Sequence, residues 1–396
     1  MSPDLFDPRS TRSWLAVCLV ATACKNAPQQ PVVSEELSLC SVDVHQHFAS
    51  NVPFDTAARA MLEAMDAIGI RTALVMPPPQ EAESIASSGA HYEYFDPSAG
   101  GGPSLLDMVR DNPDRFALVA GGGLLNSAAH EAVLSGEDAT TAQLDQLQID
   151  AEAMLADGAK GFGELSGLHF SLEETHPFLS IPADHPMFLR LATVAAEHGV
   201  PIDIHLETVA RASIDVPADF LPTTPNGAPC FLAPNNNPDT VSNNVQGFEN
   251  LLEHSHAAAC AAGDCDKARV IWSHIGWDNV GDLDVDLIAR LIEAHPNLYL
   301  SLKLLDQPSF CQLGDNRPLA DTDGDGTYDT MLASWASLIA ENPQRFVLGA
   351  DEFFADGSDT IGTSSTNGTW TLLAHLPADA QRAVACDNPR RLYNLP

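Results

Sequence analysis

The sequence predicts an α/β fold, a (β/α)8 TIM barrel with long inserted βα loops and an N-terminal export segment. Two observations lead to this prediction. Short apolar runs alternate with segments whose apolar residues recur at three- and four-residue spacing, which is the order of parallel strands and their covering helices. Histidines and acidic residues end several of the apolar runs. A parallel barrel brings such strand ends together at one rim.

Length and composition limit the classes of protein. The 396 residues suffice for one large barrel or for two average domains, and a hydrophobic content of 45% excludes global disorder. The 54 acidic and 19 basic residues give a formal charge of −35. Such a surface repels phosphate backbones and anionic membranes, so we expect no nucleic-acid partner. An acidic coat for solubility explains most of these charges.

Residues 1–23 have the composition of an export signal. Arg9 and Arg12 precede the apolar run 14–23, which at about ten residues is too short to span a bilayer. Ala-Thr-Ala at 21–23 is a cleavage pattern. We therefore expect an exported protein.

The residue after this pattern is Cys24. The arrangement resembles a bacterial lipoprotein signal, which implies that Cys24 is lipidated and that residues 24–39 form a tether. The protein would then lie in the cell envelope, with a lipid anchor as its membrane contact; free secretion is the alternative.

Six cysteines remain once Cys18 is removed with the signal and Cys24 is assigned to lipid. They are Cys40, Cys230, Cys260, Cys265, Cys311 and Cys386. An even number in an exported chain predicts disulfides. Cys260 and Cys265 flank a Gly-Asp turn and form the best local pair. The chain has no Cys-x-x-Cys motif, which disfavours a cysteine zinc site.

The predicted elements follow one another in a regular order. Strand-like runs lie near residues 41–47, 71–77, 115–121, 159–165, 200–206, 269–275, 297–303 and 345–351. Helical patterns lie at 55–68, 140–155, 187–198, 245–257, 285–294 and 331–341. Eight strands with helices between them indicate one barrel domain over residues 40–396 rather than an antiparallel sandwich.

Three stretches exceed an ordinary βα loop, namely 78–104, 208–243 and 305–329, and all are rich in Gly, Pro, Asn and Asp. Each follows a strand, so each lies on the carboxyl-end rim. We expect them to wall a pocket; decoration without function is the alternative.

Metal-ligand types stand at the ends of the predicted strands. His45 and His47 are two apart on a strand, so both can face one ion. His205, His274 and Asp351 each end another apolar run. A buried carboxylate in such a place needs a cation or several donors. Imidazole and carboxylate together suit Zn²⁺ or a similar divalent ion.

These features resemble a known superfamily. The motifs are His-x-His at 45–47, the single residues His205, His274 and Asp351, Ser-His-Ile-Gly-Trp at 273–277 and Asn-Pro-Arg-Arg-Leu at 388–392. In this order they resemble the amidohydrolase superfamily, in particular the branch called amidohydrolase-2, over residues 40–395. The resemblance implies a metal-dependent hydrolase of TIM-barrel fold.

The resemblance also implies roles. His45, His47 and His205 would bind the metal, and Asp351 would contact it or take a proton from its water. His274 would orient a substrate carbonyl or bind a second ion. One or two ions are both possible readings. Glu164, at the end of another predicted strand, resembles the glutamate that bridges two ions in some relatives; Lys160 is the alternative bridge.

Two residues are candidates for substrate contact. Lys303 ends a predicted strand, where a cation can hold a substrate carboxylate or phosphate, and a salt bridge to a nearby acid is the alternative. Trp277 follows His274 closely; its ring can stack on a planar substrate or cap the barrel.

A second metal motif lies in the last long loop. Asp321, Asp323, Asp325 and Asp329 occupy positions 1, 3, 5 and 9 of an EF-hand-type calcium loop, with Gly at position 6. Leu332 stands at position 12, where a glutamate is usual. We expect a Ca²⁺ ion that orders this loop; a solvated acidic loop is the alternative.

The leading hypothesis is an exported metal-dependent hydrolase that cleaves an amide, ester or lactone bond of a small molecule. A metal-dependent non-oxidative decarboxylase on the same barrel is the alternative, followed by a non-enzymatic lipoprotein that binds a ligand or metal. A deoxyribonuclease is disfavoured, because the chain has no basic stripe. The sequence indicates neither the substrate nor the oligomeric state.

Overall fold

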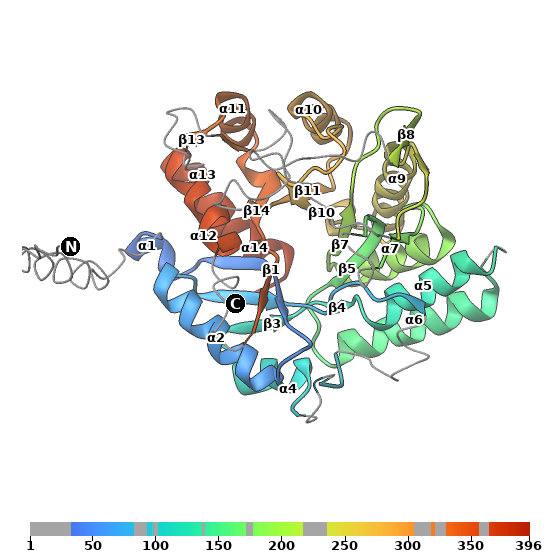
Figure 1. Cartoon of the computed structure of the whole chain (residues 1–396), viewed down its shortest axis with the longest axis horizontal. Helices are drawn as coiled ribbons and strands as arrows, with labels where there is room; N and C mark the ends of the chain where they lie inside the picture. Colours follow the sequence, from blue (N-terminus) through green and yellow to red (C-terminus); the bar gives the residue numbers. More distant parts are fainter. Residues whose placement is uncertain are drawn as a thin grey trace, which may run out of the picture. The chain divides into compact units, whose positions relative to one another are not determined.

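A ring of parallel strands forms the centre of the protein in a computed structural model of the chain. The chain divides into two units, Met1–Pro31 and Val32–Pro396. The structure describes the second unit at residues 33–82, 93–96, 98, 102–136, 139–171, 177–216, 236–304, 318–320, 330–355 and 364–396. Figure 1 shows the helices of this unit around the strands.

The strands of the ring are β1 (Val42–Phe48), β2 (Thr72–Val75), β3 (Phe116–Leu118) with β4 (Ala120–Gly121), β5 (Phe162–His169), β7 (Ile202–Leu206), β10 (Val270–Ile275), β11 (Leu298–Leu302) and β14 (Phe346–Leu348) with β15 (Glu352–Phe354). They form two hydrogen-bonded sheets, ordered β15-β1-β2-β3 and β14-β11-β10-β7-β5-β4. Because β3 runs into β4 and β14 leads into β15, the sheets join. The backbone N–H of Asp351 donates to the carbonyl of His45 at 2.8 Å where the ring closes. The predicted (β/α)8 barrel is confirmed.

The helices of the unit are α1 (Glu35–Ser38), α2 (Phe54–Ile68), α4 (Leu105–Asp111), α5 (Leu124–Leu134), α6 (Thr141–Ala156), α7 (Pro186–His198), α9 (Val245–Ala261), α10 (Val285–Ala294), α11 (Ala333–Glu341), α12 (Ser364–Thr371), α13 (Ala378–Arg382) and α14 (Asn388–Leu392). The six predicted helices match α2, α6, α7, α9, α10 and α11. The prediction for α11 begins too early, because Met331 pairs with Leu319 in a short hairpin of β12 (Leu319–Ala320) and β13 (Thr330–Met331). The sequence prediction missed α4, α5 and the helices after residue 363, and it missed α1, whose residues fall in the predicted tether 24–39.

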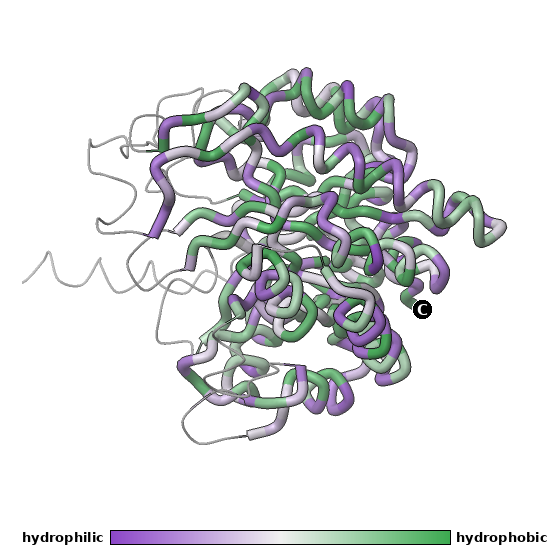
Figure 2. The backbone as a smooth tube through the Cα atoms, turned by 90° about the vertical axis from the view of Figure 1, so that its right-hand side faces the viewer, coloured by the Kyte–Doolittle hydropathy of each residue, from purple (hydrophilic) through white to green (hydrophobic). Residues whose placement is uncertain are grey.

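Two apolar layers hold the barrel. Strand side chains alternate between the interior and the helices. On β2, for example, Leu74 belongs to the interior cluster, whereas Ala73 and Val75 pack in the outer cluster with the helices. The interior cluster also contains Leu392 and Tyr393 from the C-terminal segment. In Figure 2 hydrophobic strand segments run through the middle, and hydrophilic residues alternate with apolar ones along the outer helices. None of the described helices is long and apolar enough to cross a membrane.

Two disulfides are present in the described residues. Cys260–Cys265 is the local pair that the sequence predicted. Cys40–Cys386 joins the segment before β1 to the segment before α14, across a sequence separation of 346. Cys24, Cys230 and Cys311 lie outside the described residues.

Candidate metal centre

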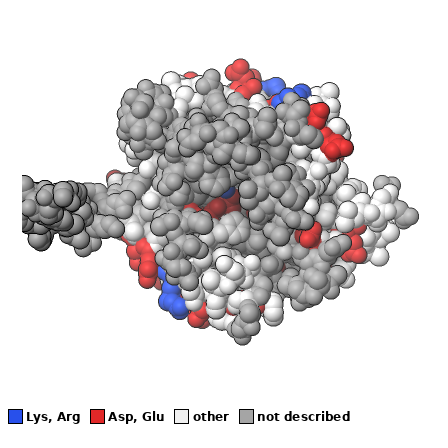
Figure 3. All heavy atoms as spheres, viewed as in Figure 1, with Lys and Arg blue, Asp and Glu red and all other residues white. Residues whose placement is uncertain are grey.

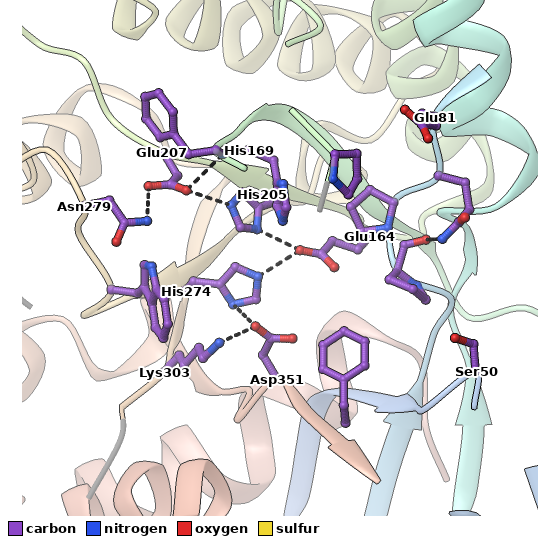
Figure 4. A pocket seen from close by; sticks show the side chains of 17 residues that line it. Ser50, Glu81, Glu164, His169, His205, Glu207, His274, Asn279, Lys303 and Asp351 are labelled. Carbon is purple, nitrogen blue, oxygen red and sulfur yellow. Dashed lines mark hydrogen bonds and ion pairs between the residues drawn. The ribbon is translucent and has the colours of Figure 1, made fainter. Parts of the chain in front are cut away.

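The strand ends bring six ligand-type side chains to one place. β1 supplies His45 and His47, β5 supplies Glu164, β7 supplies His205, β10 supplies His274, and Asp351 follows β14. Figure 3 shows acidic side chains at the bottom of a hollow in this face, and Figure 4 shows how Glu164, His205, His274 and Asp351 point toward one another. Residues more than 300 positions apart therefore meet, as the parallel barrel requires.

The two histidines of β1 turn the same nitrogen toward the centre. The Nε2 atoms of His45 and His47 lie 3.0 Å apart. They lie 3.5 and 3.4 Å from Oε2 of Glu164. Nδ1 of His47 lies 2.9 Å from the carbonyl oxygen of Met76. A carbonyl only accepts, so Nδ1 carries the proton and Nε2 presents a lone pair to the centre in the neutral ring.

The other oxygen of Glu164 faces a second pair of histidines. Oε1 lies 2.8 Å from Nδ1 of His205 and 2.9 Å from Nε2 of His274. Each carboxylate oxygen of Glu164 is thus next to two imidazoles, and the side chain is buried.

Both carboxyl groups of the centre are ionised. Burial alone would raise the pKa of Glu164, but the charge of His45 and the hydrogen bonds of His205 and His274 outweigh it and hold the pKa well below its usual range. Burial likewise opposes ionisation of Asp351. The charge of Lys303 and the hydrogen bond of His47 nevertheless hold the pKa of Asp351 well below normal.

Two of the histidines, His45 and His205, balance this negative charge by binding protons. Burial disfavours the charged imidazole of His205, yet Glu164 and Glu207 raise its pKa to about 9. The carboxylates of Asp203 and Glu164 similarly outweigh burial and raise the pKa of His45. Burial dominates at His274 and lowers its pKa to about 4. The cluster therefore attracts positive charge, which a divalent cation supplies when it displaces these protons.

The donor set fits such a cation. His45, Glu164, His274 and Asp351 each offer one ligand atom, and these atoms lie within 4.8 Å of one another. A buried group of imidazole nitrogens and carboxylate oxygens suits Zn²⁺ and similar ions.

A left-handed backbone conformation orients two of these side chains. His274 and Asp351 have φ values of +62° and +51°. Both lie in the left-handed region, which costs a non-glycine residue roughly 1–2 kcal/mol. His274 is the last but one residue of β10, and Asp351 lies between β14 and β15, where this conformation turns the chain. Strained backbone of this kind is common at functional sites.

A pocket of about 500 Å³ opens above the centre. Its walls include Pro78, Pro79, Phe170 and Phe353, together with Trp277. The stretch at 78–81 thus lies where the sequence predicted a pocket wall. Of the other two long loops, much of 208–243 and nearly all of 305–329 lie outside the described residues.

Lys303 and Trp277 also line the pocket. The ammonium of Lys303 donates to Oδ2 of Asp351 and lies 4.3 Å from the centre of the Trp277 ring. The salt bridge that was the alternative for Lys303 is therefore present, and substrate contact by either residue stays a prediction.

Lys160 is not part of the strand that supplies Glu164. It precedes β5, its backbone N–H donates to Leu118, and it is not among the described residues that line the pocket. The calcium motif Asp321, Asp323, Asp325 and Asp329 lies outside the described residues.

Sequence reasoning missed two acids, Asp203 and Glu207. Asp203 lies 3.4 Å from Nδ1 of His45. Oε1 of Glu207 lies 3.8 Å from Nε2 of His205. The other oxygen of Glu207, Oε2, accepts from Nδ2 of Asn279 at 2.5 Å. Both are two residues from His205, so the two-residue period of a strand is the signal that points to them.

Comparisons with known proteins give the family of the chain. A family model described as Amidohydrolase matches residues 42–395. No curated protein matches the chain. One similar structure is a provisionally assigned amidohydrolase from Staphylococcus aureus, with 13% identity, a TM-score of 0.44 and coverage of 90% of this chain and 99% of that one.

A second similar structure is a provisionally assigned metal-dependent hydrolase from Lactobacillus casei, with 12% identity, a TM-score of 0.48 and coverage of 91% of this chain and 97% of that one. The assignment rests on the family model, which spans nearly the whole described unit. The chain belongs to the amidohydrolase family and is an enzyme of amidohydrolase type with a site for a divalent metal.

Proposed function

We propose that this protein is an exported hydrolase that cleaves an amide, ester or lactone bond of a small molecule, at a centre where Glu164 and the histidines around it would hold two divalent ions. The observation that carries the proposal is the position of this carboxylate. One oxygen faces His45 and His47, and the other bonds to His205 and His274. A carboxylate with two imidazoles at each oxygen is the arrangement of a bridging ligand.

The residues of the centre divide into two groups around Glu164. His45, His47 and Asp351 form one group, because Oδ1 of Asp351 lies 3.0 Å from Nε2 of His47. His205 and His274 form the other. When bound, a divalent cation supplies Lewis acidity, which activates water at neutral pH and polarises a carbonyl.

Asp351 is the proposed proton carrier. It is ionised, lies at the pocket floor, and is held at Oδ2 by Lys303. It can accept a proton from the attacking water and return it to the leaving group. The apolar walls formed by Pro78, Phe170 and Phe353 suit the uncharged part of a small substrate and exclude water from it.

The test is metal removal and return. Purified protein is expected to contain about two equivalents of a divalent ion by elemental analysis. A chelator should abolish turnover of esters, lactones or amides in a substrate screen, and Zn²⁺, Mn²⁺ or Co²⁺ should restore it. Active protein without bound ion would refute the proposal. Release of CO₂ from carboxylic acids, without hydrolysis, would instead establish the decarboxylase alternative.

Export and lipidation at Cys24 are part of the same proposal. The two described disulfides support an oxidising compartment. Metabolic labelling with a fatty acid should mark the wild type and not Cys24→Ser. For the loop 321–329 we propose Ca²⁺ binding, which luminescence of bound Tb³⁺ would detect and Asp321→Asn/Asp323→Asn would reduce.

A further inference from the structure

Asp203 is a fully buried carboxylate inside the barrel. It lies on β7, two residues before His205, and has no exposed surface. The hydroxyl of Ser273 on the neighbouring strand β10 donates to its Oδ1. A buried carboxylate is costly without such partners, so its presence calls for an explanation.

The second group at Oδ1 is a histidine of the metal centre. Nδ1 of His45 lies 3.4 Å from Oδ1 of Asp203. The opposite nitrogen, Nε2, lies 3.0 Å from Nε2 of His47 and 3.5 Å from Glu164. This is an ion-pair contact, and because a carboxylate only accepts, the proton of the neutral ring belongs on Nδ1 and the lone pair on Nε2.

The two histidines of the His-x-His motif are therefore supported differently. His47 has a backbone carbonyl, that of Met76, at its Nδ1. At Nδ1 of His45 the partner is instead the carboxylate side chain of Asp203. An imidazole that donates to a carboxylate is a stronger electron donor to a metal, and it is held in one tautomer.

The side chain of Asp203 fits into the barrel interior because its neighbour Gly163 has no side chain. A Cβ atom at Gly163 would lie 2.7 Å from Cβ of Asp203, so the glycine next to Glu164 makes space for it. Tyr393 of the C-terminal segment is fully buried and interacts electrostatically with the same carboxyl group. Burial and the charge of Asp203 raise the pKa of this phenol well above its ordinary value.

We infer that Asp203 is a positioning residue, which holds the His45 ring with Nδ1 protonated and Nε2 presented to the metal. The inference rests on the proposed metal centre. It assigns Asp203 no contact with substrate or ion, and it predicts an effect on metal affinity.

The test compares two buried carboxylates. Asp203→Asn removes the charge behind His45. Asp43→Asn is the control, because Asp43 is equally buried but accepts from the Trp370 ring and from the backbone N–H groups of His45 and Ala350, and an asparagine oxygen can still accept the two backbone bonds. Competition with a chromophoric chelator gives the Zn²⁺ dissociation constant. We expect Asp203→Asn to weaken binding by about 10–100-fold, and Asp43→Asn to leave it close to the wild-type value even if the protein unfolds more easily.

A measurement on the unaltered protein covers the case in which Asp203→Asn does not fold. In zinc-loaded protein with ¹⁵N-labelled histidine, a long-range ¹H–¹⁵N spectrum should show the His45 ring protonated at Nδ1, with the signal assigned by its loss in His45→Gln. Protonation at Nε2, or equal affinities in the two aspartate variants, would overturn the inference and leave the metal centre standing. Wild type that binds no ion would overturn both.

Discussion

Glu164 contacts nitrogens from three different strands, so its side chain decides how many ions the centre holds. The two histidines of β1 meet one of its oxygens, and those of β7 and β10 meet the other. Removing the charge leaves both pairs in place and takes away the ligand that they share.

We therefore expect Glu164→Gln to lower the metal content from about two equivalents to one or fewer. Turnover should fall by at least about 100-fold, since loss of one ion removes part of the charge stabilisation. Elemental analysis and initial rates test this. Glu81→Gln is the matched control, because Glu81 lines the same pocket and lies apart from the histidines in Figure 4. Unchanged metal content in Glu164→Gln would contradict the two-ion centre.

Site residues could be predicted from the sequence where they stand at the ends of strands. His45, His205 and Asp351 end apolar runs, and parallel strands ending at one rim must meet. Asp203 and Glu207 were not recognised, because an acidic residue in or next to an apolar run is equally compatible with a strand at the solvent-exposed edge of a sheet. The sequence does not show that Asp203 lies next to His45 across the barrel, and this contact gives the carboxylate its proposed role.

At the scale of elements, all eight strands were predictable from apolar runs, because burial on both faces imposes them. The turns at their ends were not. The registers of β1 with β2 and of β10 with β11 shift beside the ligands, and His274 adopts a left-handed backbone. Bulges and positive φ values of non-glycine residues follow from tertiary packing, which has no local signature. Helix α5 was missed because it is apolar on most of its surface and shows no clear stripe.

Helices α9 and α10 are joined by a salt bridge whose contribution depends on pH. Glu249 lies 2.7 Å from Arg290 and 3.4 Å from His295. Although burial opposes ionisation, these partners lower the pKa of Glu249. A depressed folded-state pKa gives stability that is present above the unfolded value and lost as the pH falls through the folded one.

Glu249→Gln should therefore destabilise the protein by about 1 kcal/mol or less at pH 7. The difference in Tm from wild type should shrink as the pH falls below about 4. Thermal unfolding between pH 3 and 8 measures it, with the exposed Glu253→Gln on the same helix as control. A difference in Tm that grows toward acid pH would contradict this assignment.

For the whole molecule, the two disulfides enclose loops of very different length. Their sequence separations are 346 and 5. In the chain-entropy model the long loop contributes roughly 6 kcal/mol and the short one roughly 2 kcal/mol. Cys40→Ala/Cys386→Ala should thus lower the urea midpoint far more than Cys260→Ala/Cys265→Ala. Equal shifts for the two pairs would show that the long-range bond does not restrict the unfolded chain.

The closure of the ring has a consequence for biosynthesis. β1 pairs with β15, and Cys40 is bonded to Cys386. Translation delivers the first strand hundreds of residues before its partner, so a chain still on the ribosome cannot complete the barrel. The unfinished sheet must keep two open edges until synthesis ends, and a secretion channel or chaperone that takes up unfolded chains would meet the protein in that state.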